Sequence, residues 1–232
     1  MRPIIAAVLA LPLIALVGCQ GREGVPSLRT EDQKASYGIG LQMGEQLQAA
    51  EGRIDVNAFM AGFRDGMAGR DPALSQDEIE AALMALGEAI QEEEMARYAE
   101  EAERNAREGA AFLEENRAKE GVQVTESGLQ YEVLREGEGE RPSLEDQVSI
   151  HYRGTLIDGT QFDSSYDRGE PAVFGVGGVI SGFAEALQLM PEGSHYRVFI
   201  PSELGYGPQG SGRVIGPNAT LIFEIELLEI VR

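Results

Sequence analysis

Between residues 30 and 90, apolar side chains recur every three or four positions, which is the spacing of a helix face. Residues 30–48 begin with Thr30 and carry Gln33 three positions later, so a capping box and a first helix are predicted. Residues 55–67 predict a second, shorter helix, which ends before a Gly-Arg-Asp-Pro sequence. The apolar face of this second helix consists of Val56, Phe59, Met60, Phe63 and Met67.

A much longer helix is predicted to follow. Residues 75–78 form a second capping box, and from residue 91 to residue 119 the chain has no Pro and only one Gly, Gly109. Helix formers dominate, and ~44 residues would give a rod of ~65 Å. The second half is polar nearly all round, which is typical of a helix that bridges separate bodies. A coiled coil along Tyr98, Ala102, Ala106 and Ala110 is the alternative.

After Gly121 the pattern changes from a helical period to alternation, and β-branched and aromatic residues become frequent. Residues 183–190 predict one short helix among strands, so we expect an antiparallel sheet packed on a single helix, an α+β domain. Phe112 and Leu113, near the end of the long helix, are expected to pack on this domain. The predicted strands are residues 129–134, 148–156, 198–201 and 221–230.

The first 18 residues are typical of a secretory signal peptide, because Arg2 precedes an apolar run too short for a membrane span. The sequence LVGC at 16–19 resembles a bacterial lipobox, which makes Cys19 the predicted lipidation site. Acyl chains stabilise membrane attachment by ~0.8 kcal/mol per buried methylene. A free thiol after an ordinary signal peptide is the alternative. Gln20 follows the cysteine, and the sorting rules of Gram-negative lipoproteins then favour the outer membrane, with the periplasmic side expected.

Composition narrows the classes of function. The 232 residues carry a formal net charge of -20, which repels phosphate backbones, so no nucleic-acid partner is expected. One Cys and two His exclude an intrachain disulfide and argue against a zinc site. Hydrophobic residues make up 43% and charged residues 25% of the chain, which is a globular profile.

Six short motifs in the last hundred residues follow one another in a characteristic order. They are YRG at 152–154, LIDG at 156–159, FDSS at 162–165, Gly177 with VISGF at 179–183, LGYG at 204–207 and IGPNATLIF at 215–223. Together they resemble the FKBP-type prolyl isomerases along the whole of that domain. Upstream, YGIG at 37–40 and GLQY at 128–131 resemble the macrophage infectivity potentiator (Mip) and FkpA group of Gram-negative isomerases.

The resemblance implies an α+β architecture with an N-terminal all-helical dimerisation module, a long connecting helix and a C-terminal FKBP-type antiparallel sheet packed on a short helix. It implies a homodimer that isomerises X-Pro bonds of unfolded or proline-containing extracytoplasmic proteins without a cofactor, and chaperone activity is a linked hypothesis. A non-catalytic module that binds proline segments in adhesion or envelope assembly is the alternative. The expected divisions are 1–18 signal peptide, 19–29 flexible tether, 30–74 dimerisation module, 75–120 connecting helix and 121–232 isomerase domain.

The family's apolar pocket is carried over by motif. A water-poor pocket suits this reaction, because the twisted amide has lost the charge separation of the planar one. Asp163 is expected to face the substrate carbonyl region, Tyr206 to hydrogen-bond a substrate carbonyl, and Arg168 to orient Asp163. The implied catalytic residues are Tyr152, Phe162, Asp163, Phe183, Tyr206 and Phe223, and the implied substrate-binding residues are Arg168, Val179, Ile180 and Ile215.

Two positions depart from the family pattern. Phe183 stands where Trp is most frequent, and Phe is a smaller platform that lacks the indole N–H. Ala172 stands where many relatives have a bulky aromatic residue, and is expected to open one rim of the pocket. We expect activity to survive with altered substrate preference, and the resemblance implies binding of tacrolimus or rapamycin. Packing in the core is the alternative role for each aromatic residue.

Overall fold

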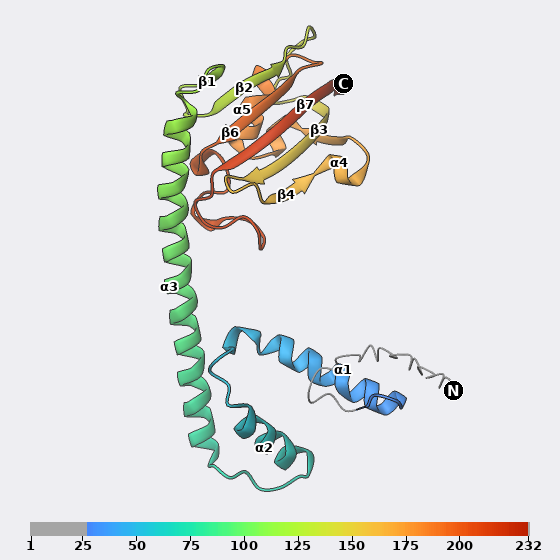
Figure 1. Ribbon diagram of the computed structural model, residues 1–232, viewed down its shortest axis with the longest axis vertical. Helices are drawn as coiled ribbons and strands as arrows, with labels where there is room; N and C mark the ends of the chain where they lie inside the picture. The colour runs from blue at the N-terminus through green and yellow to red at the C-terminus, as the bar shows by residue number, and fades with distance from the viewer. Residues whose placement is uncertain (1–26, 232) are drawn as a thin grey trace, which may run out of the picture. The chain divides into compact units, whose positions relative to one another are not determined.

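The computed structural model describes residues 27–231 (Figure 1). The predicted signal peptide and the predicted lipidation site at Cys19 lie outside these residues. The chain divides into two compact units, one ending at Ser75 and the other beginning at Gln76, and each is described by itself. None of the helices within residues 27–231 combines the length and the apolarity that crossing a membrane requires.

The first unit contains α1 (Glu31–Gln46), the 3-10 turn η1 (Gln48–Ala50) and α2 (Val56–Met67). The predicted capping box is confirmed, because the Thr30 side chain accepts the Gln33 backbone N–H at 3.2 Å and the Gln33 side chain accepts that of Thr30 at 3.1 Å. Neither α1 nor α2 contains a buried residue. These helices therefore form locally, while their apolar faces stay open.

The second unit begins with α3 (Gln76–Asn116), a helix of 41 residues that confirms the predicted long helix at slightly shorter length. Gly121, at φ +86°, then turns the chain toward the sheet. The end of the helix is tied to the domain that follows, because the buried Asn116 donates from Nδ2 to Gln130 Oε1 at 2.9 Å. Phe112 packs its ring 5.9 Å from that of Phe199, so the prediction that it contacts this domain is confirmed.

The rest of the second unit is an antiparallel sheet packed on one helix, α5 (Ser181–Leu189), and the predicted α+β class is confirmed. The strand order is β1-β2-β6-β7-β3-β4, and β5 also pairs with β3. The strands are β1 (Val122–Val124), β2 (Gln130–Arg135), β3 (Gln147–Leu156), β4 (Gln161–Ser164), β5 (Ala172–Gly175), β6 (His195–Ile200) and β7 (Leu221–Val231). Short helical turns join them: α4 (Ser165–Arg168), η2 (Val176–Gly178), η3 (Ser202–Leu204) and η4 (Gly207–Gln209).

The two faces of this sheet differ in character, as alternation along β7 shows. Leu221, Phe223, Ile225 and Leu227 are buried in the core that α5 covers, whereas the residues between them are partly exposed. On the outer face, Glu224 accepts Arg197 at 2.9 Å and Arg153 at 2.7 Å. The core therefore lies between sheet and helix, and the pocket described next opens at its edge.

Candidate active site

A cavity of about 550 Å³ opens where α5, the middle of the sheet and the connection between β6 and β7 meet. Every predicted catalytic or substrate-binding residue except Arg168 lines it, and Arg168 lies just behind Asp163. The predicted residues that line it are Tyr152, Phe162, Asp163, Val179, Ile180, Phe183, Tyr206, Ile215 and Phe223.

The floor of the cavity is a cluster of aromatic rings in edge-to-face contact. Phe183 and Phe223 have ring centroids 5.0 Å apart at 82°, and Phe162 meets Phe223 at 5.4 Å and 81°. Phe183 is only 4% exposed, so it lies beneath the cavity and not on its rim. Edge-to-face packing holds such rings in place, which gives a rigid apolar surface before any ligand arrives.

Gly154 of β3 explains how these rings approach so closely. A Cβ atom at this position would lie 2.4 Å from Phe162 Cε2 and 2.8 Å from Phe223 Cε1, closer than any real side chain allows. The glycine of the YRG motif therefore makes room for two pocket rings.

The polar corner of the cavity is built by Asp163, Arg168 and Tyr152. Asp163 Oδ1 accepts Arg168 Nη1 at 2.7 Å, Asp163 Oδ2 accepts the Tyr152 hydroxyl, and Arg168 Nη2 donates to that hydroxyl at 3.0 Å. The Arg168 guanidinium also lies 5.5 Å from the centre of the Tyr152 ring. These contacts fix the carboxylate and the phenol relative to each other.

The same contacts set the protonation of the corner. Burial raises the pKa of the Asp163 carboxyl, but the hydrogen bonds from Tyr152 and Arg168 outweigh it and hold that pKa below its ordinary value. Burial, with the hydrogen bond to Asp163, raises the pKa of Tyr152. At neutral pH the corner therefore presents a carboxylate that Tyr152 and Arg168 hold in place, not a proton donor.

Tyr206 stands at the mouth of the cavity with 39% of its surface exposed, and no described residue hydrogen-bonds its hydroxyl. A free phenol beside an apolar floor can donate to a carbonyl oxygen of a bound peptide. Within residues 27–231, no three His, Cys, Asp or Glu side chains are grouped so as to hold a metal ion. The arrangement can bind an apolar peptide segment and fix one of its carbonyls.

Sequence reasoning missed part of the lining. Phe174 of β5 meets the Tyr152 ring at 5.7 Å and 62°, whereas Ala172, two residues earlier, pairs with Ile150 and does not line the cavity. Residues 211–214 also line the cavity, from a loop with no alternating pattern. Neither the four residues of β5 nor this loop carries a sequence pattern that indicates a place on the cavity.

Fold and cavity together define a domain that binds a peptide segment in a preformed aromatic pocket. Residues 138–228 match the family described as "FKBP-type peptidyl-prolyl cis-trans isomerase", and residues 32–133 match "Domain amino terminal to FKBP-type peptidyl-prolyl isomerase". The chain therefore belongs to the FKBP-type peptidyl-prolyl cis-trans isomerases, with relatives at substantial identity over most of its length.

Three of these relatives illustrate the likeness. The FKBP-type 22 kDa peptidyl-prolyl cis-trans isomerase of Escherichia coli K12 is 49% identical over 208 residues, which are 89% of this chain and 98% of that protein. The "Outer membrane protein MIP" of Legionella longbeachae is 39% identical, with 99% and 97% covered. The crystal structure of FkpA from Escherichia coli superposes with a TM-score of 0.69 at 35% identity, covering 88% of this chain and 98% of that chain.

Proposed function

We propose that the aromatic cavity is the site at which this isomerase accelerates rotation about X-Pro bonds of extracytoplasmic proteins. The observation that carries the proposal is the convergence of nine sequence-predicted residues on one cavity of about 550 Å³. Uncatalysed isomerisation crosses a barrier of ~20 kcal/mol, and each ~1.4 kcal/mol of preference for the twisted amide gives a tenfold gain in rate.

In this mechanism the prolyl ring lies on Phe183, among Tyr152, Phe162 and Phe223. The planar amide is the more polar state, so an apolar surround favours the twisted one without a nucleophile. Tyr206 donates to a carbonyl of the peptide, and the carboxylate of Asp163 faces the rotating carbonyl group. Arg168 acts on substrate only through Asp163, which it orients.

The test is turnover of a short X-Pro peptide by the full chain, with Asp163→Ala and the matched Asp167→Ala. Asp167 is an exposed carboxylate four residues further along that does not line the cavity. Asp163→Ala should lower kcat/KM about tenfold, which is ~1.4 kcal/mol, and Asp167→Ala should leave it unchanged. Peptide or tacrolimus binding by a folded chain without any acceleration would instead support the proline-binding module.

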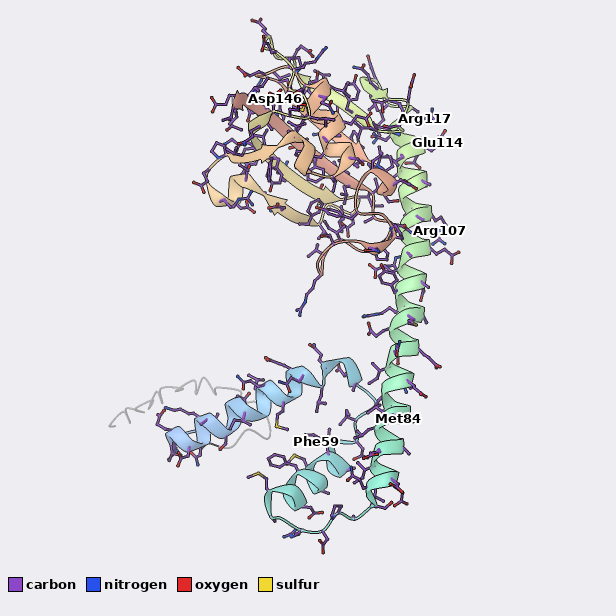
Figure 2. The ribbon with its side chains drawn as sticks, turned by 180° about the vertical axis from the view of Figure 1, so that it is seen from behind. Phe59, Met84, Arg107, Glu114, Arg117 and Asp146 are labelled. Carbon is purple, nitrogen blue, oxygen red and sulfur yellow. The ribbon has the colours of Figure 1, made fainter. Side chains whose placement is uncertain are left out.

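The first unit, by proposal the dimerisation module of residues 30–74, is expected to pair with a second copy. A groove of about 1120 Å³ between α1 and α2 is lined mainly by apolar side chains, including Ile39, Phe59 and Phe63. Phe59 projects from α2 in Figure 2. Apolar surface this continuous is unusual on a monomer. Light scattering should therefore give twice the chain mass, and a monomer at micromolar concentration would contradict the dimer.

The proposed place of action is the Gram-negative envelope, with Cys19 acylated and the chain held at the outer membrane on its periplasmic side. The lipobox-like sequence at 16–19 supports this, as does the name of the Legionella relative, "Outer membrane protein MIP". Radiolabelled palmitate should label the parent chain and not Cys19→Ser. Chaperone activity, the linked proposal, predicts suppressed aggregation of a client whose folding does not depend on proline.

A further inference from the structure

One wall of the cavity is a loop between β6 and β7, here called the pocket loop (residues 205–220). It supplies Tyr206, Ile215 and residues 211–214 to the lining. Only a few backbone hydrogen bonds hold its shape, among them Ile215 N–H to Ser211 O at 3.2 Å and Asn218 N–H to Gly207 O at 2.8 Å. With so few internal hydrogen bonds, the pocket loop depends for its shape on contacts with the element that packs against it.

Behind this loop lies α3, and three side-chain hydrogen bonds join the two. The Tyr98 hydroxyl donates to Pro208 O at 2.5 Å, and Asn105 Nδ2 donates to Pro217 O at 2.8 Å. The third bond runs from the loop to the helix, because Asn218 Nδ2 donates to Ala102 O at 3.3 Å. Positions 98, 102 and 105 share one helix face. In Figure 1 the orange-red loop runs beside the green helix.

Close packing extends the contact toward the sheet. Gly109 is buried in α3, and a Cβ atom there would lie 2.3 Å from Thr220 Oγ1 at the end of the pocket loop. Glycine weakens a helix relative to alanine, so the only glycine between residues 91 and 119 is explained by this approach. Beyond it, Gln130 Nε2 donates to Leu113 O at 2.9 Å and anchors the helix end on β2.

We propose that α3 is a positioning element for the isomerase pocket, and that Asn105 and Tyr98 hold the pocket loop in the shape that binds substrate. Neither residue lines the cavity, so each acts through the loop. The proposal rests on the assignment of this cavity as the isomerase site. When the competent shape is only a fraction of the population, apparent affinity falls by that fraction. Losing these bonds therefore weakens binding more than it slows the chemical step.

The experiment uses the full chain with Asn105→Ala, Tyr98→Phe and the double variant. Arg107→Ala is the matched control, because Arg107 is exposed on the same helix and points away from the isomerase domain (Figure 2). Measurements are kcat and KM on an X-Pro peptide, tacrolimus affinity, and hydrogen exchange of the Ile215 and Asn218 amides beside those of β3.

Asn105→Ala should raise KM and the tacrolimus Kd about three- to tenfold, the range for one net hydrogen bond, with kcat changed less than about twofold. The Ile215 and Asn218 amides should exchange faster, while β3 and the Arg107→Ala chain stay unchanged. Unchanged KM and loop exchange would overturn the proposal, as would equal acceleration of β3 exchange, since that shows general destabilisation. A parent chain without turnover would overturn the active-site assignment, while loop exchange would still test the positioning.

Discussion

The helices α1 and α2 and the sheet domain of β1–β7 use apolar side chains in opposite ways. In the sheet domain, Leu187 and Ile225 have no exposed surface, whereas Phe63 and Met67 of α2 are 41% and 77% exposed. The sheet domain completes its core within one chain. The helical unit leaves its apolar face uncovered, and this exposed apolar surface supports its proposed association with a second copy.

The strongest test of this contrast is one substitution made in both regions. Leu187→Ala should destabilise the sheet domain by about 2–5 kcal/mol, because it removes fully buried methyl groups and leaves a cavity. Leu41→Ala, on the exposed face of α1, should change the free energy of unfolding of the sheet domain by less than about 0.5 kcal/mol. The denaturant dependence of hydrogen exchange at the β3 and β7 amides measures both changes, and equal losses of stability would contradict this difference between the two regions.

Association is the next largest effect. Phe63→Glu places a charge in the apolar groove of the helical unit, so self-association should weaken by about 2 kcal/mol or more, roughly thirtyfold. Equilibrium sedimentation measures it, with Arg64→Glu as the control beside it in sequence. A Phe63→Glu chain that stays dimeric would place the interface elsewhere.

The same substitution, glycine to alanine, should have opposite and smaller effects on stability in the two halves of α3. Gly109→Ala should destabilise by about 1 kcal/mol, because the clash with Thr220 exceeds the ~1 kcal/mol that alanine gains over glycine in a helix. Gly87→Ala on the same helix should stabilise by about that ~1 kcal/mol, since its Cβ meets no described atom within 4 Å. Thermal denaturation compares them, and Gly109→Ala with Thr220→Ala should recover the loss. A stabilising Gly109→Ala would show that the contact carries no constraint.

The smallest effect is the pH dependence of the sheet's outer face. Burial raises the pKa of Glu224, but hydrogen bonds from Arg197 and Arg153 outweigh it and lower that pKa. Because the folded pKa is depressed, this stability is present above the unfolded value of about 4.3 and is lost as pH falls through the folded pKa.

Glu224→Gln should therefore lower stability at pH 7 by less than about 1 kcal/mol, and the difference from the parent chain should vanish once the pH lies below the folded pKa of Glu224. Glu229→Gln, exposed on the same strand, is the control. Melting temperatures across this range measure the effect. A difference for Glu224→Gln that persists at low pH would contradict its electrostatic origin.

Hydrophobic periodicity predicts α1, α2, the first half of α3, α5 and the longer strands, whereas the second half of α3 follows from its helix formers. The sequence does not predict the strands β1, β4 and β5, because three or four residues are too few to show alternation. Apart from Phe112, the face of α3 that packs on the domain could not be predicted from the sequence, for another reason. Asn105, Gly109 and Asn116 make that contact through hydrogen bonds and close approach, which leave no apolar stripe. Tyr98 and Ala102, two of the residues that suggest the coiled-coil alternative, belong to this same face.

For the site, the motifs located the aromatic floor, because those residues lie in strands and α5 with fixed spacing. They could not locate residues 211–214, whose place on the cavity depends on how the pocket loop folds back. Nor could they show that the Tyr152 hydroxyl, besides Arg168, holds Asp163. Local pattern therefore predicts the elements, while contacts between distant segments complete the site.

The most direct test of the central claim sets the two regions against each other in one assay of kcat/KM on a short X-Pro peptide. The Asp163→Ala variant should have a kcat/KM about tenfold lower than the parent chain, because it lacks the carboxylate of the pocket. The Phe63→Glu variant should have the same kcat/KM as the parent chain. Turnover unaffected by Asp163→Ala but lost in a folded Phe63→Glu chain would contradict the account, because catalysis would then depend on the helical unit.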